Sequence, residues 1–315
     1  MKDCTKISTI GMTREQWLAE RRKGIGGSDA GAIAGLNPYK SAMSVYLDKI
    51  GEADEQPDNE AMRQGRDFES YVAQRFSEAT GHKVQRKNAI LVHPEHDFIF
   101  ANVDRMIIGE NEGLECKTTS PFNAKLYEDG KIPPHYELQC MHYMAVTGAT
   151  KWHLAVLVLN KAFYTFTIER DEQMVADLLK IECDFWNNYV LPQKMPPPDG
   201  SASAQEIIRQ LYPDSTPNYS IELVGHDDQL KRYIEIGRLI KQLTEEQDQI
   251  KQNIQMELKD AERGLANGFV VNWKGIKSAR LDTKRLKQEH PSIYDQYAKQ
   301  STSRRFEIKE IVGNE

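Results

Sequence analysis

Residues 113–121 read GLECKTTSP, and the first five of them place an acid and a base inside a short, otherwise apolar stretch. In an extended chain, successive side chains alternate between the two faces of a sheet. Glu115 and Lys117 therefore point to one face, and Cys116 points to the other. An acid and a base on the same face of an interior strand form either a plain salt bridge or half of a catalytic centre.

A second carboxylate lies upstream, in the stretch FANVDRMI at residues 100–107. This stretch and GLECK are predicted to be antiparallel strands joined by a tight turn, which brings Asp104 near Glu115. Two buried carboxylates repel each other unless a cation lies between them. Mg²⁺ is a hard cation that prefers oxygen ligands, so it suits such a pair. Lys117 would then stabilise developing phosphate charge or help to generate hydroxide, whereas the alternative is a cross-strand salt bridge without catalysis.

The segments around this pair predict a mixed α/β core of roughly 190 residues. Helices are predicted from a capping box at Thr13, from Ser28 as the cap of a short helix, from the apolar periodicity of residues 60–79, after Pro134, and from Asp171. Strands are predicted around Val84 and at 89–92, 98–108, 113–117, 152–160 and 163–170, the last two as a hairpin. We therefore expect an α/β (α+β) fold with a central mixed β-sheet flanked by helices.

The stretch LPQKMPPPDGSAS at residues 191–203 is the best candidate for a domain boundary, because proline, serine and glycine interrupt regular structure. We expect a core that carries Asp104 and Glu115 at residues 1–195, a linker at 196–226 and a C-terminal helical and β module at 227–315. The module begins with a charged helix at 227–262 whose apolar positions recur as in a helical hairpin or a short coiled coil. A strand at 268–281 and a short helix capped by Asp282 follow.

Charge is unevenly distributed along the chain. The net charge of −6 is not that of a general nucleic-acid binder, which usually carries a basic surplus. The C-terminal module nevertheless contains a basic strip at residues 273–287, in which Lys274, Lys277 and Arg280 are candidate DNA contacts. The alternative is a solvated basic face that contacts no phosphate.

Cysteine content and hydropathy argue against several classes of protein. The four cysteines are scattered without a CxxC pair, which argues against a zinc ribbon, an iron–sulfur cluster or a disulfide framework. The N-terminal residues show no apolar run of signal-peptide type, and the most apolar segment is far too short to span a bilayer. We therefore expect a cytoplasmic protein without a membrane partner.

Taken together, these motifs resemble the PD-(D/E)xK nuclease superfamily, and within it the branch of YqaJ-like viral recombinases and lambda exonuclease. The core of that superfamily is a helix, a β-meander that carries D…ExK, and a helix on the far side. Asp104, Glu115 and Lys117 occupy the motif positions. The family also carries a glutamate on the first helix, here Glu69 in GRDFES, and a glutamine on the later helix that orients the attacking water, here Gln139 in HYELQCMHYMAVTG.

In this family an arginine and, seven residues later, a serine hold the 5′-phosphate of a DNA end. Arg21 and Ser28 stand at that spacing in RRKGIGGS, with Arg22 as an alternative arginine. Glycines before a helix N-terminus also expose free amides, which suits a phosphate. Tyr136, one helical turn before Gln139, is a further candidate DNA contact.

The resemblance implies a metal site and a role for each of its residues. Asp104, Glu115 and the main-chain carbonyl of Cys116 would bind Mg²⁺, with Mn²⁺ as a substitute. Glu69 would be an outer ligand, and Lys117 would act as the catalytic base or stabilise the phosphate.

The resemblance covers about residues 13–192 and implies a Mg²⁺-dependent exonuclease that resects linear double-stranded DNA 5′-to-3′ from a phosphorylated end. The product would be a 3′ single strand for a single-strand annealing protein in phage-type recombination. The resemblance also implies a homo-oligomer, a ring-shaped trimer, in the host cytoplasm. Two alternatives remain: a structure-specific or restriction-type endonuclease with the same centre, and a catalytically idle protein that binds DNA ends or a partner.

Overall fold

The strand that carries Glu115 and Lys117 lies in the middle of the larger sheet. In the computed structural model, which describes residues 4–54, 58–300 and 302–310, the strands of this sheet have the order β3-β6-β7-β8-β9. They are β3 (Val84–Arg86), β6 (Arg105–Ile107), β7 (Glu112–Thr119), β8 (Lys151–Val158) and β9 (Ala162–Glu169). The pair β7–β8 is parallel and the other pairs are antiparallel. The parallel pair is connected through η1 (Pro121–Leu126), η2 (Glu128–Gly130) and the crossover helix α5 (Pro134–Thr147).

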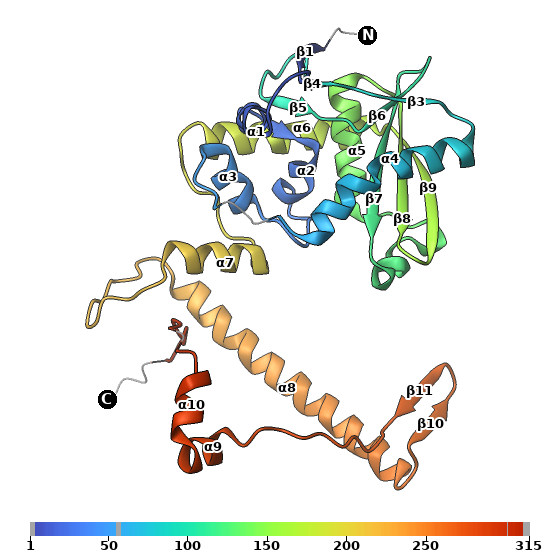
Figure 1. Cartoon of the computed structure of the whole chain (residues 1–315). Helices are drawn as coiled ribbons and strands as arrows, with labels where there is room; N and C mark the ends of the chain where they lie inside the picture. Colours follow the sequence, from blue (N-terminus) through green and yellow to red (C-terminus); the bar gives the residue numbers. More distant parts are fainter. Residues whose placement is uncertain (1–3, 55–57, 301, 311–315) are drawn as a thin grey trace. The chain divides into compact units, whose positions relative to one another are not determined.

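Helices cover both faces of this sheet (Figure 1). The helix α4 (Glu60–Thr80) packs Phe76 and its apolar neighbours against one face, together with Ala155 of β8. The even-numbered residues of β8, from Trp152 to Val158, pack on the opposite side in the cluster that contains α5. The predicted fold class, a central mixed sheet flanked by helices, is confirmed.

A smaller sheet accounts for the largest difference from the predicted strands. Its order is β1-β4-β5-β2 in the described residues, with β1 (Thr5–Ser8), β2 (Ile25–Gly26), β4 (Ala89–Val92) and β5 (Ile99–Ala101). The predicted strand 98–108 is therefore divided, because β5 joins this sheet and β6 joins the larger one. The chain leaves β5 at Asn102, and Asn and Asp are depleted in strands. Asp104 consequently lies just before β6 and not within a strand.

Three short helices precede α4, namely α1 (Arg14–Arg22), α2 (Gly27–Ile33) and α3 (Ala42–Ile50). The predicted capping box at Thr13 is confirmed, since Thr13 Oγ1 accepts the N–H of Gln16 at 3.2 Å. The prediction that Ser28 caps α2 is wrong. Gly26 is the N-cap residue, because the side chain of Asp29 accepts the N–H of Gly26 at 3.1 Å. The predicted helix from Asp171 is α6 (Glu172–Phe185), followed by the π-helical turn η3 (Trp186–Val190).

The first compact unit extends past the expected core boundary at residue 195 and ends at Leu211. Within the stretch 196–226, which was expected to be a linker, lies the helix α7 (Ala202–Leu211). It buries Ala204 and Ile207 in the apolar cluster that contains α3. The proline-rich stretch therefore leads into a last helix of the first unit, and the division falls after it.

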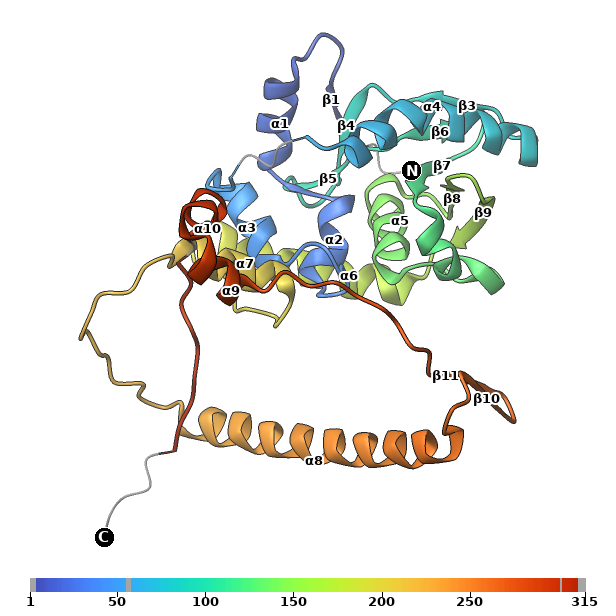
Figure 2. The same ribbon diagram turned by 60° about the horizontal axis from the view of Figure 1, so that its bottom comes forward.

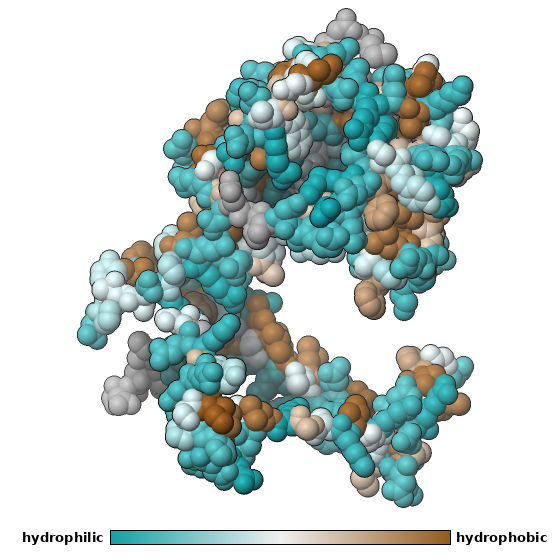
Figure 3. Space-filling model, in the orientation of Figure 1, coloured by the Kyte–Doolittle hydropathy of each residue, from teal (hydrophilic) through white to brown (hydrophobic). Residues whose placement is uncertain are grey.

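The second unit contains a long helix and short elements. These are α8 (Asp227–Leu258), the hairpin β10 (Arg263–Ala266) and β11 (Phe269–Asn272), α9 (Thr283–Glu289) and α10 (Pro291–Tyr297). The apolar seam of α8 is exposed, and apolar patches follow the helix in Figure 3. The predicted strand 268–281 ends already at Asn272, whereas the predicted cap Asp282 does begin α9. Within the described ranges, no helix combines the length and apolarity needed to cross a membrane.

Candidate active site

Glu115 and Lys117 lie on β7 and face α5. In the parallel register Glu115 is opposite Leu154 and Lys117 is opposite Val156, and both of these β8 residues belong to the cluster on the α5 side. Lys117 Nζ donates a hydrogen bond to Glu115 Oε1 at 2.5 Å, and Glu115 is only 3% exposed. Cys116 packs against the cluster on the α4 side. The predicted alternation of this stretch is therefore confirmed.

Gln139 of α5 reaches the same carboxylate. Its Nε2 donates hydrogen bonds to Glu115 Oε1 and to Tyr143 Oη, each at 2.8 Å. The other oxygen, Glu115 Oε2, is buried and has no hydrogen-bond partner among the residues that the structure describes. A buried carboxylate oxygen without a partner costs free energy. This oxygen is therefore available to a cationic ligand.

Asp104 supplies a second carboxylate at this place. Its Oδ2 accepts the backbone N–H of Cys116 at 2.8 Å. Burial and, next, the negative charge of Glu115 raise the pKa of Asp104 well above its ordinary value. A carboxylate whose charge is disfavoured, beside a second carboxylate with an unpartnered oxygen, fits a hard divalent cation. The structure brings Asp104 and Glu115 together as expected, and their role as metal ligands, like that of the Cys116 carbonyl, stays a prediction.

Two contacts keep Lys117 cationic. Burial by itself would lower the pKa of Lys117, but Glu115, Tyr136 and Asp104 together outweigh burial and the pKa is raised. Lys117 Nζ also lies 4.8 Å from the centroid of the Tyr136 ring, which is a cation–π arrangement. An ion pair between Lys117 and Glu115 is thus present, although within one strand and not across strands. Glu115 Oε2 still has no partner within the described residues, and the pKa of Asp104 stays raised although Lys117 acts to lower it, so the ion pair accounts for only part of the site.

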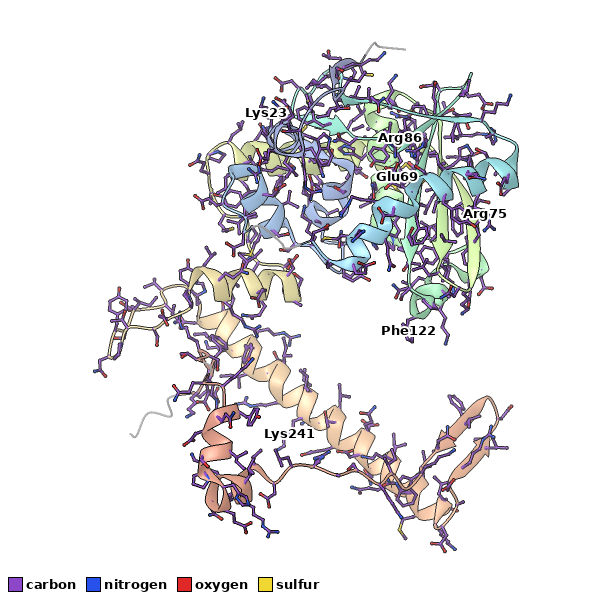
Figure 4. The ribbon with its side chains drawn as sticks, in the orientation of Figure 1. Lys23, Glu69, Arg75, Arg86, Phe122 and Lys241 are labelled. Carbon is purple, nitrogen blue, oxygen red and sulfur yellow. The ribbon has the colours of Figure 1, made fainter. Side chains whose placement is uncertain are left out.

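Glu69 lies on α4, and arginines hold it. Its Oε1 accepts a hydrogen bond from Arg105, and Arg86 Nη2 lies 3.6 Å from the same oxygen (Figure 4). Arg105 is opposite Leu114 in the β6–β7 register, and Leu114 packs on the α4 side. Glu69, which contacts Arg105, is therefore held on the α4 side of the sheet, whereas Glu115 faces α5. In the described part of the chain, no three acidic, histidine or cysteine side chains are arranged to hold a metal ion. Glu69 as an outer ligand therefore stays a prediction.

Arg21 and Ser28, which were predicted to hold a terminal phosphate, are neighbours in the structure. Arg21 Nη2 donates a hydrogen bond to Ser28 Oγ at 3.1 Å. The alternative arginine, Arg22, instead lies 3.9 Å from Asp48. Ser28 is exposed and Arg21 is half-buried, so an anion can reach both from solvent. Of the two arginines, Arg21 is the one that fits the predicted pair.

A buried aspartate that sequence reasoning missed supports this pair. Asp29 contacts the ammonium groups of Lys40 at 2.8 Å and Lys49 at 2.7 Å. Burial would raise the pKa of Asp29, but Lys40, Lys49 and Arg21 outweigh burial and hold the pKa well below its ordinary value. Lys49 Nζ also donates to the backbone carbonyl of Arg21 at 3.3 Å. Asp29 stands next to Ser28 in the sequence, but no local pattern indicates that two distant lysines meet there.

Helix α2 packs directly on α5, as both ribbon views show (Figures 1 and 2). A Cβ atom at Gly27 would lie 2.6 Å from the Tyr143 ring, and one at Gly31 would lie 2.7 Å from Cβ of His135. Because Tyr143 also accepts the hydrogen bond from Gln139, Gly27 and Gln139 contact the same tyrosine. The helix that carries Ser28 and the helix that carries Gln139 therefore meet at Tyr143.

We expect Gly27→Ala to lower the free energy of unfolding by about 1–3 kcal/mol, because the added methyl group overlaps the Tyr143 ring and must move α2 or α5. Denaturant unfolding measures this change. The matched control is Gly65→Ala on α4, where a Cβ atom would meet no described atom within 4 Å. Gly65→Ala is expected to be neutral or slightly stabilising. Equal effects of the two substitutions would contradict the close packing at Gly27.

The remaining candidates lie in different units. Tyr136 is beside Lys117 in the first unit. Lys274, Lys277 and Arg280 lie in the second unit, all exposed, on the segment between β11 and α9. A DNA contact of any of these residues stays a prediction.

Solved structures with a similar fold match part of the chain. An alkaline exonuclease from Laribacter hongkongensis is 18% identical with a TM-score of 0.48, and the match covers 62% of this chain and 97% of that one. A phage-related exonuclease from Haemophilus somnus 129PT is 12% identical with a TM-score of 0.41, and the match covers 54% of this chain and 96% of that one.

Sequence comparison finds a family domain in the first half of the chain and a relative over nearly all of it. A family model described as the YqaJ-like viral recombinase domain matches residues 16–150, a range that contains Asp104, Glu115, Lys117 and Gln139. An uncharacterised protein of Bacillus subtilis (strain 168), YqaJ, is 42% identical over 304 residues, which are 95% of each chain. The chain therefore belongs to the YqaJ-like viral recombinase family.

Proposed function

We propose that this protein is a Mg²⁺-dependent exonuclease that degrades linear double-stranded DNA from a phosphorylated 5′ end. The observation that carries the proposal is the buried pair Asp104 and Glu115, because Glu115 Oε2 has no partner within the described residues and Glu115 raises the pKa of Asp104. Membership of a viral recombinase family supports DNA as the substrate. The 5′-to-3′ polarity, and the 3′ strand left for an annealing protein, follow from the resemblance of Arg21 and Ser28 to a 5′-phosphate site.

The residues of the centre have separate roles in this proposal. Asp104 and Glu115 would hold a divalent cation, which would supply positive charge to the scissile phosphate and make a water molecule more acidic. Lys117, which already donates to Glu115, would donate to a phosphate oxygen as negative charge develops there. Gln139 Nε2 donates both to Glu115 and to Tyr143. Its carbonyl oxygen is then left to accept a hydrogen bond from the attacking water and to orient it.

Arg21 and Ser28 would set the position of the DNA end. Arg21 and the Ser28 hydroxyl both carry donors that suit a terminal phosphate. Because α2 packs on α5 at Gly27, an end held at Arg21 would stay in a fixed position relative to the helix that carries Gln139. With the DNA end held in this position, cleavage would begin at a 5′ end and not within the duplex.

We expect Arg21→Gln to lower the preference for a 5′-phosphorylated end by about tenfold, which corresponds to the loss of one hydrogen bond to a charged group. The measurement is kcat/KM for nucleotide release from linear duplexes with phosphorylated and hydroxyl 5′ ends. The matched control is Arg22→Gln, since Arg22 lies by Asp48 and not by Ser28. An unchanged preference in Arg21→Gln, or the same loss in Arg22→Gln, would contradict the assignment.

The same assay separates the alternative activities. An exonuclease releases nucleotides from linear DNA in Mg²⁺, releases none in EDTA, and leaves a covalently closed plasmid intact. Cutting of the closed plasmid would instead indicate an endonuclease with the same centre. Binding of DNA ends without any release of nucleotides in Mg²⁺ would indicate a catalytically idle protein.

The resemblance also supports a homo-oligomer, a ring-shaped trimer, that acts together with a single-strand annealing protein. Light scattering of the purified full chain measures the mass of the assembly. A monomer at all concentrations would contradict the ring without affecting the catalytic proposal.

A further inference from the structure

A row of aromatic rings leads from the surface of the first unit to Lys117. Tyr39 is 72% exposed, and its ring meets His135 edge-on with the ring centroids 6.4 Å apart. The centroids of His135 and Tyr136 are 4.2 Å apart. Tyr136 in turn lies 4.8 Å from Lys117 Nζ, the ammonium that contacts Glu115. The rings therefore form a continuous path from solvent to the catalytic centre.

The local structure holds the exposed end of this row in place. Asn37 Oδ1 accepts the backbone N–H groups of Tyr39 at 2.8 Å and Lys40 at 3.1 Å, a side-chain turn that fixes the loop after α2. Lys40 Nζ is paired with the buried Asp29 at 2.8 Å. His135 stands where α5 packs against α2. A ring on such a fixed loop can contact a ligand at a low cost in conformational entropy.

Each end of the row is linked by a contact to one of the two phosphate positions of the proposed function. On one side, Lys40 contacts Asp29, which directly follows Ser28. On the other side, Tyr136 contacts Lys117. In a DNA strand, two consecutive phosphates flank one nucleoside. A strand with its terminal phosphate at Ser28 and its next phosphodiester at Lys117 would place its first base beside the rings.

We propose that Tyr39, with His135 and Tyr136 behind it, is a stacking site for the base of the 5′-terminal nucleotide after that base has left its complement. This inference rests on the proposed function, which supplies both phosphate positions, the one at Ser28 and the one at Lys117. Every base has a π-face, so the site accepts all four bases and discriminates only against a nucleotide without a base. Stacking on Tyr39 holds the terminal nucleoside while the phosphodiester on its 3′ side is at Lys117.

The test measures binding and does not depend on cleavage. The probe is a 5′-phosphorylated oligonucleotide with the fluorescent base 2-aminopurine as its first nucleotide, added to the full chain in Ca²⁺ and again in EDTA. We expect stacking to quench the fluorescence with the wild type and with Tyr39→Phe, which keeps the ring. Tyr39→Leu should lose the quenching and bind the probe about tenfold more weakly. The matched control is Tyr71→Leu, an exposed tyrosine on α4, which should leave the quenching unchanged.

A second probe with an abasic first nucleotide completes the test. The wild type should bind it about tenfold more weakly than the intact probe, and Tyr39→Leu should bind the two probes equally. Unchanged quenching in Tyr39→Leu, an equal loss in Tyr71→Leu, or equal binding of both probes by the wild type would overturn the proposal. Quenching that depends on Tyr39 in a protein that releases no nucleotides in Mg²⁺ would support the base site and contradict the exonuclease, so the two failures can be told apart.

Discussion

Replacing Asp104 with asparagine is expected to abolish nucleotide release and, at the same time, to raise the melting temperature of the metal-free protein. Asparagine keeps an oxygen that can accept the Cys116 N–H, which Asp104 Oδ2 now accepts at 2.8 Å. It removes a negative charge that burial and Glu115 disfavour. It also removes a ligand of the proposed cation, so we expect the rate to fall by at least about 10³-fold. Opposite signs for activity and stability are typical of a group kept for function at a cost in folding free energy.

The gain in stability from Asp104→Asn has a defined pH dependence. Because the pKa of Asp104 is raised in the folded protein, its charge lowers stability only above the ordinary carboxyl pKa, and this cost increases with pH up to the folded-state pKa. The difference in melting temperature should therefore be a few degrees at about pH 8 and smaller at about pH 5.

Calorimetry in EDTA measures this difference, with the exposed Asp67→Asn on α4 as the control that should change little at either pH. If Asp104→Asn proved inactive but less stable than the wild type at high pH, the electrostatic account of the carboxylate pair would be wrong.

Lys117→Met is expected to abolish activity and to destabilise the protein. Its effect on stability is therefore opposite to that of Asp104→Asn. It removes the ammonium 2.5 Å from Glu115 Oε1 and leaves two buried carboxylates without a positive partner on this face. Removing one partner of a buried ion pair costs about 3–5 kcal/mol. The Lys117 side chain is 21% exposed, so we expect about 3 kcal/mol, or a fall of roughly 6–12 °C in melting temperature.

A double-mutant cycle tests whether this loss comes from uncompensated charge. Adding Glu115→Gln to Lys117→Met should restore most of the stability and none of the activity. The matched control is Lys151→Met on β8, where the pair with Glu169 is 3.8 Å long and exposed, so the change should be within about 1 kcal/mol. A Lys117→Met protein as stable as the wild type would show that the ion pair contributes nothing to folding.

The sequence predicted those features that depend on neighbouring residues. The alternation of an extended chain was enough to place Glu115 and Lys117 on one face and Cys116 on the other. The capping box at Thr13 and the cap at Asp282 are likewise formed within one helical turn. Local chemistry determines such features, so they can be read without knowledge of the fold.

The features that were missed depend on contacts between distant parts of the chain. The strand predicted over 98–108 divides because its two halves find partners in different sheets. The pairing of Glu69 with Arg105, and of Asp29 with Lys49, joins residues far apart in sequence. Periodicity carries no information about such pairs. The place of α7 in the first unit depends on a distant contact in the same way, since α7 packs against α3.

The central claim is that Asp104 and Glu115 together bind one divalent cation, and a Mn²⁺ titration followed by electron paramagnetic resonance tests it most directly. The wild type should bind Mn²⁺, and added Mg²⁺ should displace the bound Mn²⁺. Both Asp104→Asn and Glu115→Gln should weaken Mn²⁺ binding by at least about tenfold. Glu112→Gln, on the same strand but paired with His153, should bind as the wild type does. Equal affinity of Glu115→Gln and the wild type for Mn²⁺ would contradict the claim.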